Sequence, residues 1–263
     1  MHNIMYILYH FAIALSTLFI KKLTPNYNFV ILVNVQVIPG VHQLTYRFVN
    51  MVLIVEERLT LIDTGFRGSY SRIADCISRL GRSIQELELI IITHNHLDHV
   101  GGLAELKKAT SAKIAAGKAD LSQDENGLPY PRYLRKLMHI PPISIFRSLV
   151  YAKPGEVDIH LVGGEVLSPL GGLRVIPTPG HTPGSISLFS ATKKLLIVGD
   201  AINNRHRDFR LPPKDVSSDL SQAIDSIKKL AQLDFETLCC GHGKPVIGGA
   251  SIRVGDWIKR QGL

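Results

Sequence analysis

Imidazole and carboxylate side chains are concentrated in one short segment, THNHLDH. Three histidines (His94, His96 and His99) and Asp98 fall within six positions, and these side chains are usual nitrogen and oxygen ligands of zinc. From an extended segment, His94 and His96 can point the same way, while Asp98 and His99 on the following turn can face the same space. This spacing predicts two adjacent metal positions. The alternative is a solvated histidine-rich loop, which the preceding apolar run, Leu89 to Ile92, argues against.

Three further candidate ligands lie in the second half of the chain. His181 stands in the loop PTPGHTPGS, whereas Asp200 and His242 each follow an apolar stretch that reads as a strand. One division of these residues over two ions is His94, His96 and His181 for the first, Asp98, His99 and His242 for the second, and Asp200 as the bridge. Zinc lowers the pKa of bound water to about 7, so a hydroxide between the ions could attack a carbonyl. Asp98 could orient this hydroxide or relay a proton as a catalytic residue.

The elements that must position these residues follow from the hydrophobic pattern. Residues 28–66 alternate β-branched and polar residues, with turn signals at Pro39-Gly40, Asn50 and Glu56-Glu57, which predicts an antiparallel meander. The meander ends at Asp63, which could hold a ligand histidine, cap the next helix, or do both.

Later segments alternate between strand and helix patterns, which predicts an α/β protein. Strands are expected at 87–92, 112–116, 159–162, 173–176, 186–189, 195–198 and 237–240, and helices at 69–80, 103–109 and 219–233. Ser217 or Ser218 is the expected cap of the last helix.

Composition sets broad limits. The chain has 263 residues, a formal charge of +8 and three cysteines. Its lysines and arginines are dispersed, so the charge is only a weak indication of anionic substrates, nucleic acid or a membrane surface. The cysteines form neither a disulfide framework nor a Cys-x-x-Cys pair, and a reducing compartment follows as the default.

The predicted domain is residues 26–263; one segment precedes it, and another interrupts it as an insertion. Residues 1–25 form a hydrophobic N-terminal segment, in which 4–20 is long enough for a marginal membrane span. Lys21-Lys22 after it would leave the rest of the chain in the cytoplasm, attached to the membrane; an upstream start artefact is the alternative. Residues 118–156 resemble an inserted lid, which could instead contact a membrane, form a homodimer contact or be an ordinary helix pair.

Four motifs in order, THNHLDHVGG, PTPGHTPGS, VGDA and CGHGKP, resemble those of the metallo-β-lactamase superfamily, and LIDTG resembles its early strand motif. The resemblance covers roughly residues 34–254. It implies a four-layer αβ/βα sandwich with two mixed β-sheets flanked by helices, metals at one edge between the sheets, and the ligand roles given above.

The branch within the superfamily is less sharply defined. Asp200 resembles the bridging aspartate of the glyoxalase II, lactonase and sulfur-metabolism branches, which true β-lactamases usually lack. Glyoxalase II enzymes typically carry a second histidine where this chain has Ser185, and many lactonases carry a tyrosine where it has Asn203. The segment Arg205 to Arg210 is either a solvated basic loop or a site for a substrate carboxylate or phosphate.

The expected activity is that of a binuclear metal-dependent hydrolase. A metal-bridging hydroxide would open or cleave a carboxylic ester, lactone or thioester of a small-molecule substrate. Zinc is the default for the two divalent ions, and Mn, Fe or Co are compatible with the same ligands. The alternatives are β-lactam amide hydrolysis as a side activity, phosphodiester or RNA hydrolysis, and a mononuclear iron persulfide dioxygenase. The sequence shows no added nucleic-acid-binding module.

Overall fold

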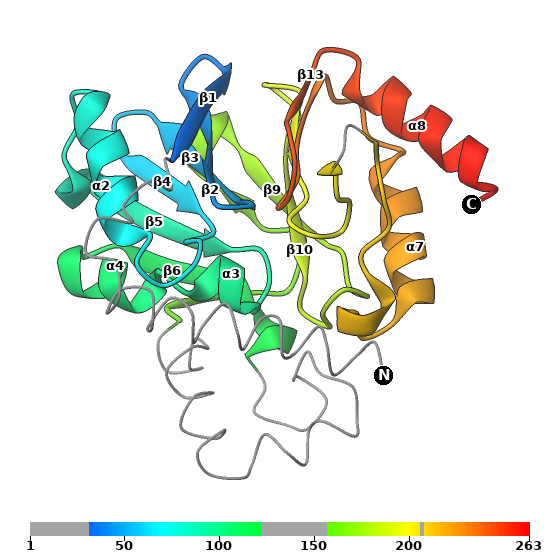
Figure 1. Ribbon diagram of the computed structural model, residues 1–263, viewed down its shortest axis with the longest axis horizontal. Helices are drawn as coiled ribbons and strands as arrows, with labels where there is room; N and C mark the ends of the chain where they lie inside the picture. The colour runs from blue at the N-terminus through cyan, green and yellow to red at the C-terminus, as the bar shows by residue number, and fades with distance from the viewer. Residues whose placement is uncertain (1–31, 122–156, 206–207) are drawn as a thin grey trace, which may run out of the picture. The chain divides into compact units, whose positions relative to one another are not determined.

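The computed structural model describes residues 32–121, 157–205 and 208–263 (Figure 1). All of them belong to one of the two units into which the chain divides, Leu32–Leu263. The predicted N-terminal segment 1–25 and residues 122–156 of the predicted insertion lie outside the described residues. Within the described part of the chain, no helix is long and apolar enough to cross a membrane.

The first sheet has seven strands in sequence order, and it confirms both the meander and the strand-helix-strand unit. The first four strands pair antiparallel, and the fourth to seventh pair parallel, so the sheet is mixed. Its strands are β1 (Val33–Ile38), β2 (Val41–Tyr46), β3 (Val49–Val55), β4 (Leu59–Ile62), β5 (Leu87–Ile92), β6 (Lys113–Gly117) and β7 (Ile159–Leu161).

The second sheet has six strands in the order β13-β12-β11-β10-β9-β8. Only β11 and β12 pair parallel; the other neighbours are antiparallel, so this sheet is mixed as well. Its strands are β8 (Val166–Leu167), β9 (Leu173–Pro177), β10 (Ile186–Ser190), β11 (Leu195–Ile197), β12 (Thr237–Cys239) and β13 (Val246–Ile247).

Helices cover the outer face of each sheet, which gives the predicted four layers (Figure 1). On the first sheet these are α2 (Tyr70–Arg79), α3 (Leu97–Val100) and α4 (Leu103–Ala109); on the second they are α7 (Leu220–Leu230) and α8 (Ala250–Gln261). Alternation along β5 shows how the layers form, because Ile90 and Ile92 pack toward the helices while Ile91 packs between the sheets. Three apolar clusters thus separate the four layers.

Short 3-10 turns complete the described structure. They are η1 (Ile84–Glu86), η2 (Lys118–Asp120), η5 (Pro169–Gly171) and η7 (Lys214–Val216).

Two local expectations are wrong. Asn50 does not mark a turn: it lies inside β3 and is buried, and the turn falls at Arg47-Phe48 instead. Neither Ser217 nor Ser218 caps α7, because Asp219 does so by accepting a hydrogen bond from the backbone N–H of Gln222 at 3.0 Å. The side chains of Ser217 and Ser218 instead contact Nδ1 of His181 and the carbonyl oxygen of Gly180.

Strand direction brings the candidate site together at one edge. In the first sheet, β4, β5 and β6 run parallel, so Asp63, the THNHLDH segment and Asp120 all follow carboxyl ends on the same side. In the second sheet, β9, β11 and β12 share one direction, and each is followed by a candidate ligand. Loops after parallel strand ends are where α/β folds collect functional groups.

Candidate metal centre

The segment after β5 presents four of the seven candidate ligands. His94 and His96 lie in the extended stretch, and the chain then turns into α3, whose first residues carry Asp98 and His99. His94 and His99 are buried, while His96 and Asp98 are half-buried. The change from strand to helix directs the four side chains into a common space, as the spacing predicted.

The other three candidates arrive on separate loops after β9, β11 and β12. His181, Asp200 and His242 are all buried. Gly241 explains how the last loop comes so close, since a Cβ at this position would lie 2.2 Å from Oδ1 of Asp200 and 2.8 Å from Cε1 of His99. Only glycine fits between these two candidate ligands.

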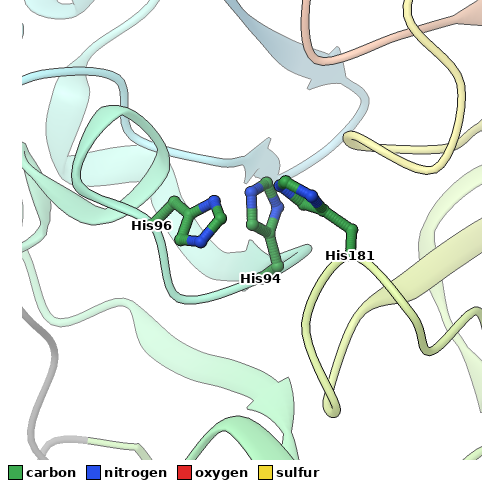
Figure 2. A group of neighbouring side chains, drawn as sticks. All are labelled: His94, His96 and His181. Carbon is green, nitrogen blue, oxygen red and sulfur yellow. The ribbon is translucent and has the colours of Figure 1, made fainter. Parts of the chain in front are cut away.

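The structure gathers all seven residues into three overlapping groups. Within each group the potential ligand atoms lie within 4.8 Å of one another; the groups are His94, His96 and His181; His94, His99 and Asp200; and Asp98, His99 and His242. Figure 2 shows the first group, with His94 and His96 projecting from one loop and His181 approaching from another. The ring centroid of His181 lies 4.8 Å from that of His94 and 4.6 Å from that of His96.

In His99 and His94, the ring nitrogen Nδ1, which faces away from the site, has a partner in the protein. His99 donates from Nδ1 to Oδ2 of Asp63 at 2.7 Å, which confirms that Asp63 holds a candidate ligand; it is not a helix cap, since Ser69 occupies the N-cap of α2. Nδ1 of His94 lies 3.0 Å from Oγ1 of Thr93, whose hydroxyl donates to Asp63. These contacts leave Nε2 of both rings directed into the site.

In the second half of the chain, His181 and His242 are also held through Nδ1. Nδ1 of His181 lies 3.1 Å from Oγ of Ser217, and Nδ1 of His242 lies 2.7 Å from the carbonyl oxygen of Phe48. A carbonyl can only accept, so Nδ1 of His242 carries a proton and Nε2 is the nitrogen that faces the site.

Four buried polar atoms at the centre lack any hydrogen-bond partner among the described residues. They are Nε2 of His94, Nε2 of His99, Nε2 of His181 and Oδ1 of Asp200. Unpaired polar atoms are costly to bury, and their convergence needs an explanation. Divalent cations fit, because neutral imidazole nitrogens and carboxylate oxygens at this spacing form a suitable donor set for zinc or a similar ion.

Electrostatics divide the histidines into two kinds. Burial, reinforced by the neighbouring imidazoles, holds the pKa of His94 well below its ordinary value and lowers the pKa of His96 to about 3. Burial also lowers the pKa of His181 to about 4, against the opposing effect of Asp200. These three rings are therefore neutral at physiological pH, as metal ligation requires.

His99 and His242 differ because they face carboxylates. Burial opposes their charged forms, but Asp63, Asp98 and Asp200 outweigh it and raise the pKa of His99 to about 9. Asp200 and Asp98 likewise overcome burial and raise the pKa of His242 to about 10. Burial works against the ionised forms of Asp98 and Asp200, yet the same two histidines keep both carboxyl pKa values low. In the metal-free protein, His99 and His242 thus carry protons that a metal must displace.

Asp120 is a structural residue of the site that the sequence did not reveal. Its carboxylate is buried and accepts hydrogen bonds from the backbone N–H of Asn95 at 2.9 Å, the hydroxyl of Thr182 at 2.7 Å and the backbone N–H of Gly184 at 2.6 Å. It therefore ties the loop of His94 and His96 to the loop of His181. The one available signal was a lone acid shortly after a predicted strand.

Asn50 ties the loop of His242 to the first sheet. Its side-chain NH₂ donates to the carbonyl oxygens of Cys240 at 2.8 Å and Gly243 at 2.7 Å, and its backbone N–H donates to the carbonyl oxygen of Gly241 at 2.8 Å. A strand of the first sheet thereby fixes the third ligand loop of the second sheet.

Comparisons with known proteins agree with this architecture. The "Probable metallo-hydrolase YflN" of Bacillus subtilis is 30% identical over 235 residues, which cover 80% of this chain and 86% of that protein. A hydroxyacylglutathione hydrolase of Bartonella henselae is 32% identical over 159 residues, covering 59% of this chain and 49% of that protein.

Solved structures share the fold. A metallo-β-lactamase family protein of Thermus thermophilus superimposes with a TM-score of 0.66 at 22% identity, covering 86% of this chain and 81% of that one. The family profile described as the metallo-beta-lactamase superfamily matches residues 44–242, a span that includes all seven candidate ligands. The chain therefore belongs to the metallo-β-lactamase superfamily.

Proposed function

We propose that the protein is a binuclear metal-dependent hydrolase of carboxylic esters, lactones or thioesters. His94, His96 and His181 would hold one divalent ion, Asp98, His99 and His242 would hold the other, and Asp200 would bridge them. Zinc is the expected metal, and Mn, Fe or Co suit the same donors.

The observation that carries this proposal is the position of Asp200. Its Oδ2 lies 3.6 Å from Nε2 of His181 and 3.2 Å from Nε2 of His242, so one carboxylate reaches both ligand groups. Its Oδ1, 3.5 Å from Nε2 of His99, has no hydrogen-bond partner among the described residues. A carboxylate in this place can bind two cations at once.

The residues of the chain would supply position and proton handling. Ions bound there would lower the pKa of water and polarise a carbonyl group. Asp98 is half-buried, and its Oδ2 lies 3.3 Å from Nε2 of His242, so it borders the centre from the more open side. It is therefore placed to orient a water molecule or to relay its proton.

The substrate class rests on chemistry and on one relative. Hydrolysis at an ester-type carbonyl needs a nucleophile and a group that stabilises the developing oxyanion. A site with two metal ions can supply both. The name of the Bartonella henselae relative describes hydrolysis of an acylglutathione. This supports ester-like and thioester substrates over β-lactam amides and phosphodiesters.

The test combines metal analysis with turnover. We expect about two equivalents of metal per chain and hydrolysis of an acyl-homoserine lactone, an aryl ester or S-lactoylglutathione. Asp200→Asn should lower kcat/KM by more than about a hundredfold, because loss of an outer partner of a ligand alone typically costs about 10- to 100-fold. Asp234→Asn is the matched control, since its exposed carboxylate pairs with Lys194 on the surface.

The same panel separates the other activities. Turnover of a cephalosporin or a phosphodiester in preference to every ester would overturn the proposed substrate class. One iron per chain, oxygen uptake with glutathione persulfide and no hydrolysis would replace the hydrolase by a dioxygenase.

A further inference from the structure

Two aromatic rings border the metal centre on the side of His242. Phe48, at the turn between β2 and β3, and Phe66, in the loop after β4, meet edge to face with centroids 5.1 Å apart. The Phe48 ring also stacks against the imidazole of His242, at 6.0 Å and 25°. Both phenylalanines are half-buried, so they form a partly exposed apolar ledge next to a candidate ligand.

Two arginines lie on this ledge. The guanidinium of Arg205 lies 5.4 Å from the centroid of Phe48, and that of Arg47 lies 5.6 Å from the centroid of Phe66. Stacking on an aromatic face fixes the plane of a guanidinium and leaves its edge N–H groups available.

Hydrogen bonds of the preceding residue hold Arg205 next to the loop of His242. The N–H of the preceding residue, Asn204, donates to the carbonyl oxygen of His242 at 3.0 Å, and the Asn204 side chain donates to the carbonyl oxygen of Lys244 at 2.7 Å. Nη2 of Arg205 lies 2.9 Å from Nδ1 of His242. That nitrogen already donates its proton to Phe48, so it does not serve as an acceptor for the arginine.

Neither guanidinium has an anionic partner in the described part of the chain. No carboxylate there lies within salt-bridge distance of Arg47 or Arg205. A guanidinium edge matches a carboxylate or phosphate with two parallel hydrogen bonds. The ledge therefore offers two cations and an apolar surface beside the imidazole of His242, a candidate metal ligand.

We propose that Arg205 and Arg47 bind an anionic group of the substrate, a carboxylate or a phosphate, while the apolar ledge of Phe48 and Phe66 carries the part that links it to the reacting carbonyl. The inference rests on the proposed hydrolase function and names its substrate class: esters, lactones or thioesters that bear an oxyanion. Arg205 is the main contact, because its guanidinium lies beside a candidate metal ligand, and Arg47 is the outer one.

A matched pair of substrates tests this assignment in the metal-loaded protein. Mono-4-nitrophenyl glutarate carries a carboxylate, whereas 4-nitrophenyl acetate is neutral and has the same leaving group. We expect the ratio of kcat/KM, charged over neutral, to exceed about ten in the wild type and to fall about 10- to 100-fold in Arg205→Gln, the loss typical of a charge-assisted hydrogen bond. Arg205→Lys should restore part of the ratio, since a lysine retains the charge without the paired geometry.

Arg253→Gln is the control, because Arg253 makes the same kind of stack, 5.6 Å from the centroid of Phe209, away from the metal centre. Its ratio should equal that of the wild type. A wild-type ratio near one, or an unchanged ratio in Arg205→Gln, would overturn the anion site while leaving the hydrolase intact.

If no ester, lactone or thioester is turned over, the proposed hydrolase function fails, and the anion site is then tested by binding alone. Calorimetric titration of the loaded protein with glutarate and with methyl phosphate separates the two anions. Weaker binding of either anion in Arg205→Gln than in Arg253→Gln supports the site, and equal binding overturns it.

Discussion

Four candidate ligands of the first half arrive on one short segment, whereas the three of the second half arrive on three separate loops. The first segment is held within its own half, where Asp63 and Thr93 contact His99 and His94. Two of the three second-half loops are also held by the first half. Asp120 binds the loop of His181, Asn50 binds the loop of His242, and the carbonyl of Phe48 accepts from His242 itself.

This difference shows how one sheet can organise a site shared by two. The first half builds its ligand group locally and also carries polar anchors for the loops of His181 and His242. Asp120 and Asn50 make buried hydrogen bonds between the halves, so the loss of either side chain leaves buried donors or acceptors without a partner. The following changes compare local anchors with anchors between the halves.

The largest effect is expected from the local anchor Asp63. Asparagine tolerates the positive φ of 60° at this position, so Asp63→Asn should fold. It loses the negative charge that orients His99, and zinc affinity should fall close to about 100-fold, the upper range for an outer partner of a ligand. Competition with a chelator measures the affinity. Asp75→Asn on α2 is the control, and equal affinities in the two variants would contradict a role for Asp63.

A smaller effect is expected from Asp120, because it holds loop backbones and not a ligand ring. Asp120→Asn should weaken zinc binding about tenfold and lower the free energy of unfolding by about 1–2 kcal/mol. Asp158→Asn is a matched control, since Asp158 also accepts from a backbone N–H, that of Ile114 at 2.8 Å, but contacts neither ligand loop. If both variants lose stability and neither loses zinc affinity, Asp120 does not link the halves of the metal centre.

pH dependence compares one ring from each half, His99 and His242. Their pKa values of about 9 and about 10 exceed the unfolded value near 6.5. Between the unfolded pKa and these folded pKa values, the folded metal-free protein therefore binds more protons than the unfolded chain. Stability should therefore decrease with rising pH, by about 1 kcal/mol per pH unit for each histidine.

Urea unfolding of chelator-treated protein at about pH 7 and about pH 8.5 measures this slope, and metal affinity should rise over the same range. The metal-loaded protein should lack the decrease, because metal replaces the protons. A metal-free protein that gains stability over this interval would contradict the assigned ion pairs.

The smallest effect is expected from Ser217, a neutral partner of His181. Ser217→Ala should weaken zinc binding only about fivefold, as the net contribution of a neutral hydrogen bond is about 1 kcal/mol. Asp219→Ala in the same loop removes the helix cap and should lower stability by about 1 kcal/mol with unchanged zinc affinity. A loss of zinc affinity in Ser217→Ala as large as that in Asp63→Asn would contradict the distinction between charged and neutral anchors.

The fold and the candidate ligands could be predicted because their signals are local or recurrent. The apolar run before His94, the glycine and proline around His181 and the glycines flanking His242 place each side chain at a strand end, and the structure brings all of them together. Asp63 followed from the same reasoning, since it ends a strand adjacent to β5.

The anchors between the halves could not be predicted, because their partners are distant backbone groups. Asn50 resembled a turn residue, yet the carbonyl oxygens to which its side-chain NH₂ donates lie 190 and 193 positions away. Asp120 fell within the predicted insertion, and its partners are 25 to 64 positions distant. Such contacts depend on how the two sheets pack, which no local pattern records. The interpretations of the N-terminal segment and of residues 122–156 remain predictions.

The most direct test of the paired centre is electron paramagnetic resonance of the protein titrated with Mn²⁺, which suits the same ligands. If Asp200 bridges two ions, the spectrum at about two equivalents should be that of a spin-coupled pair. A single bound ion per chain, or two ions with the spectrum of isolated Mn²⁺, would contradict the account.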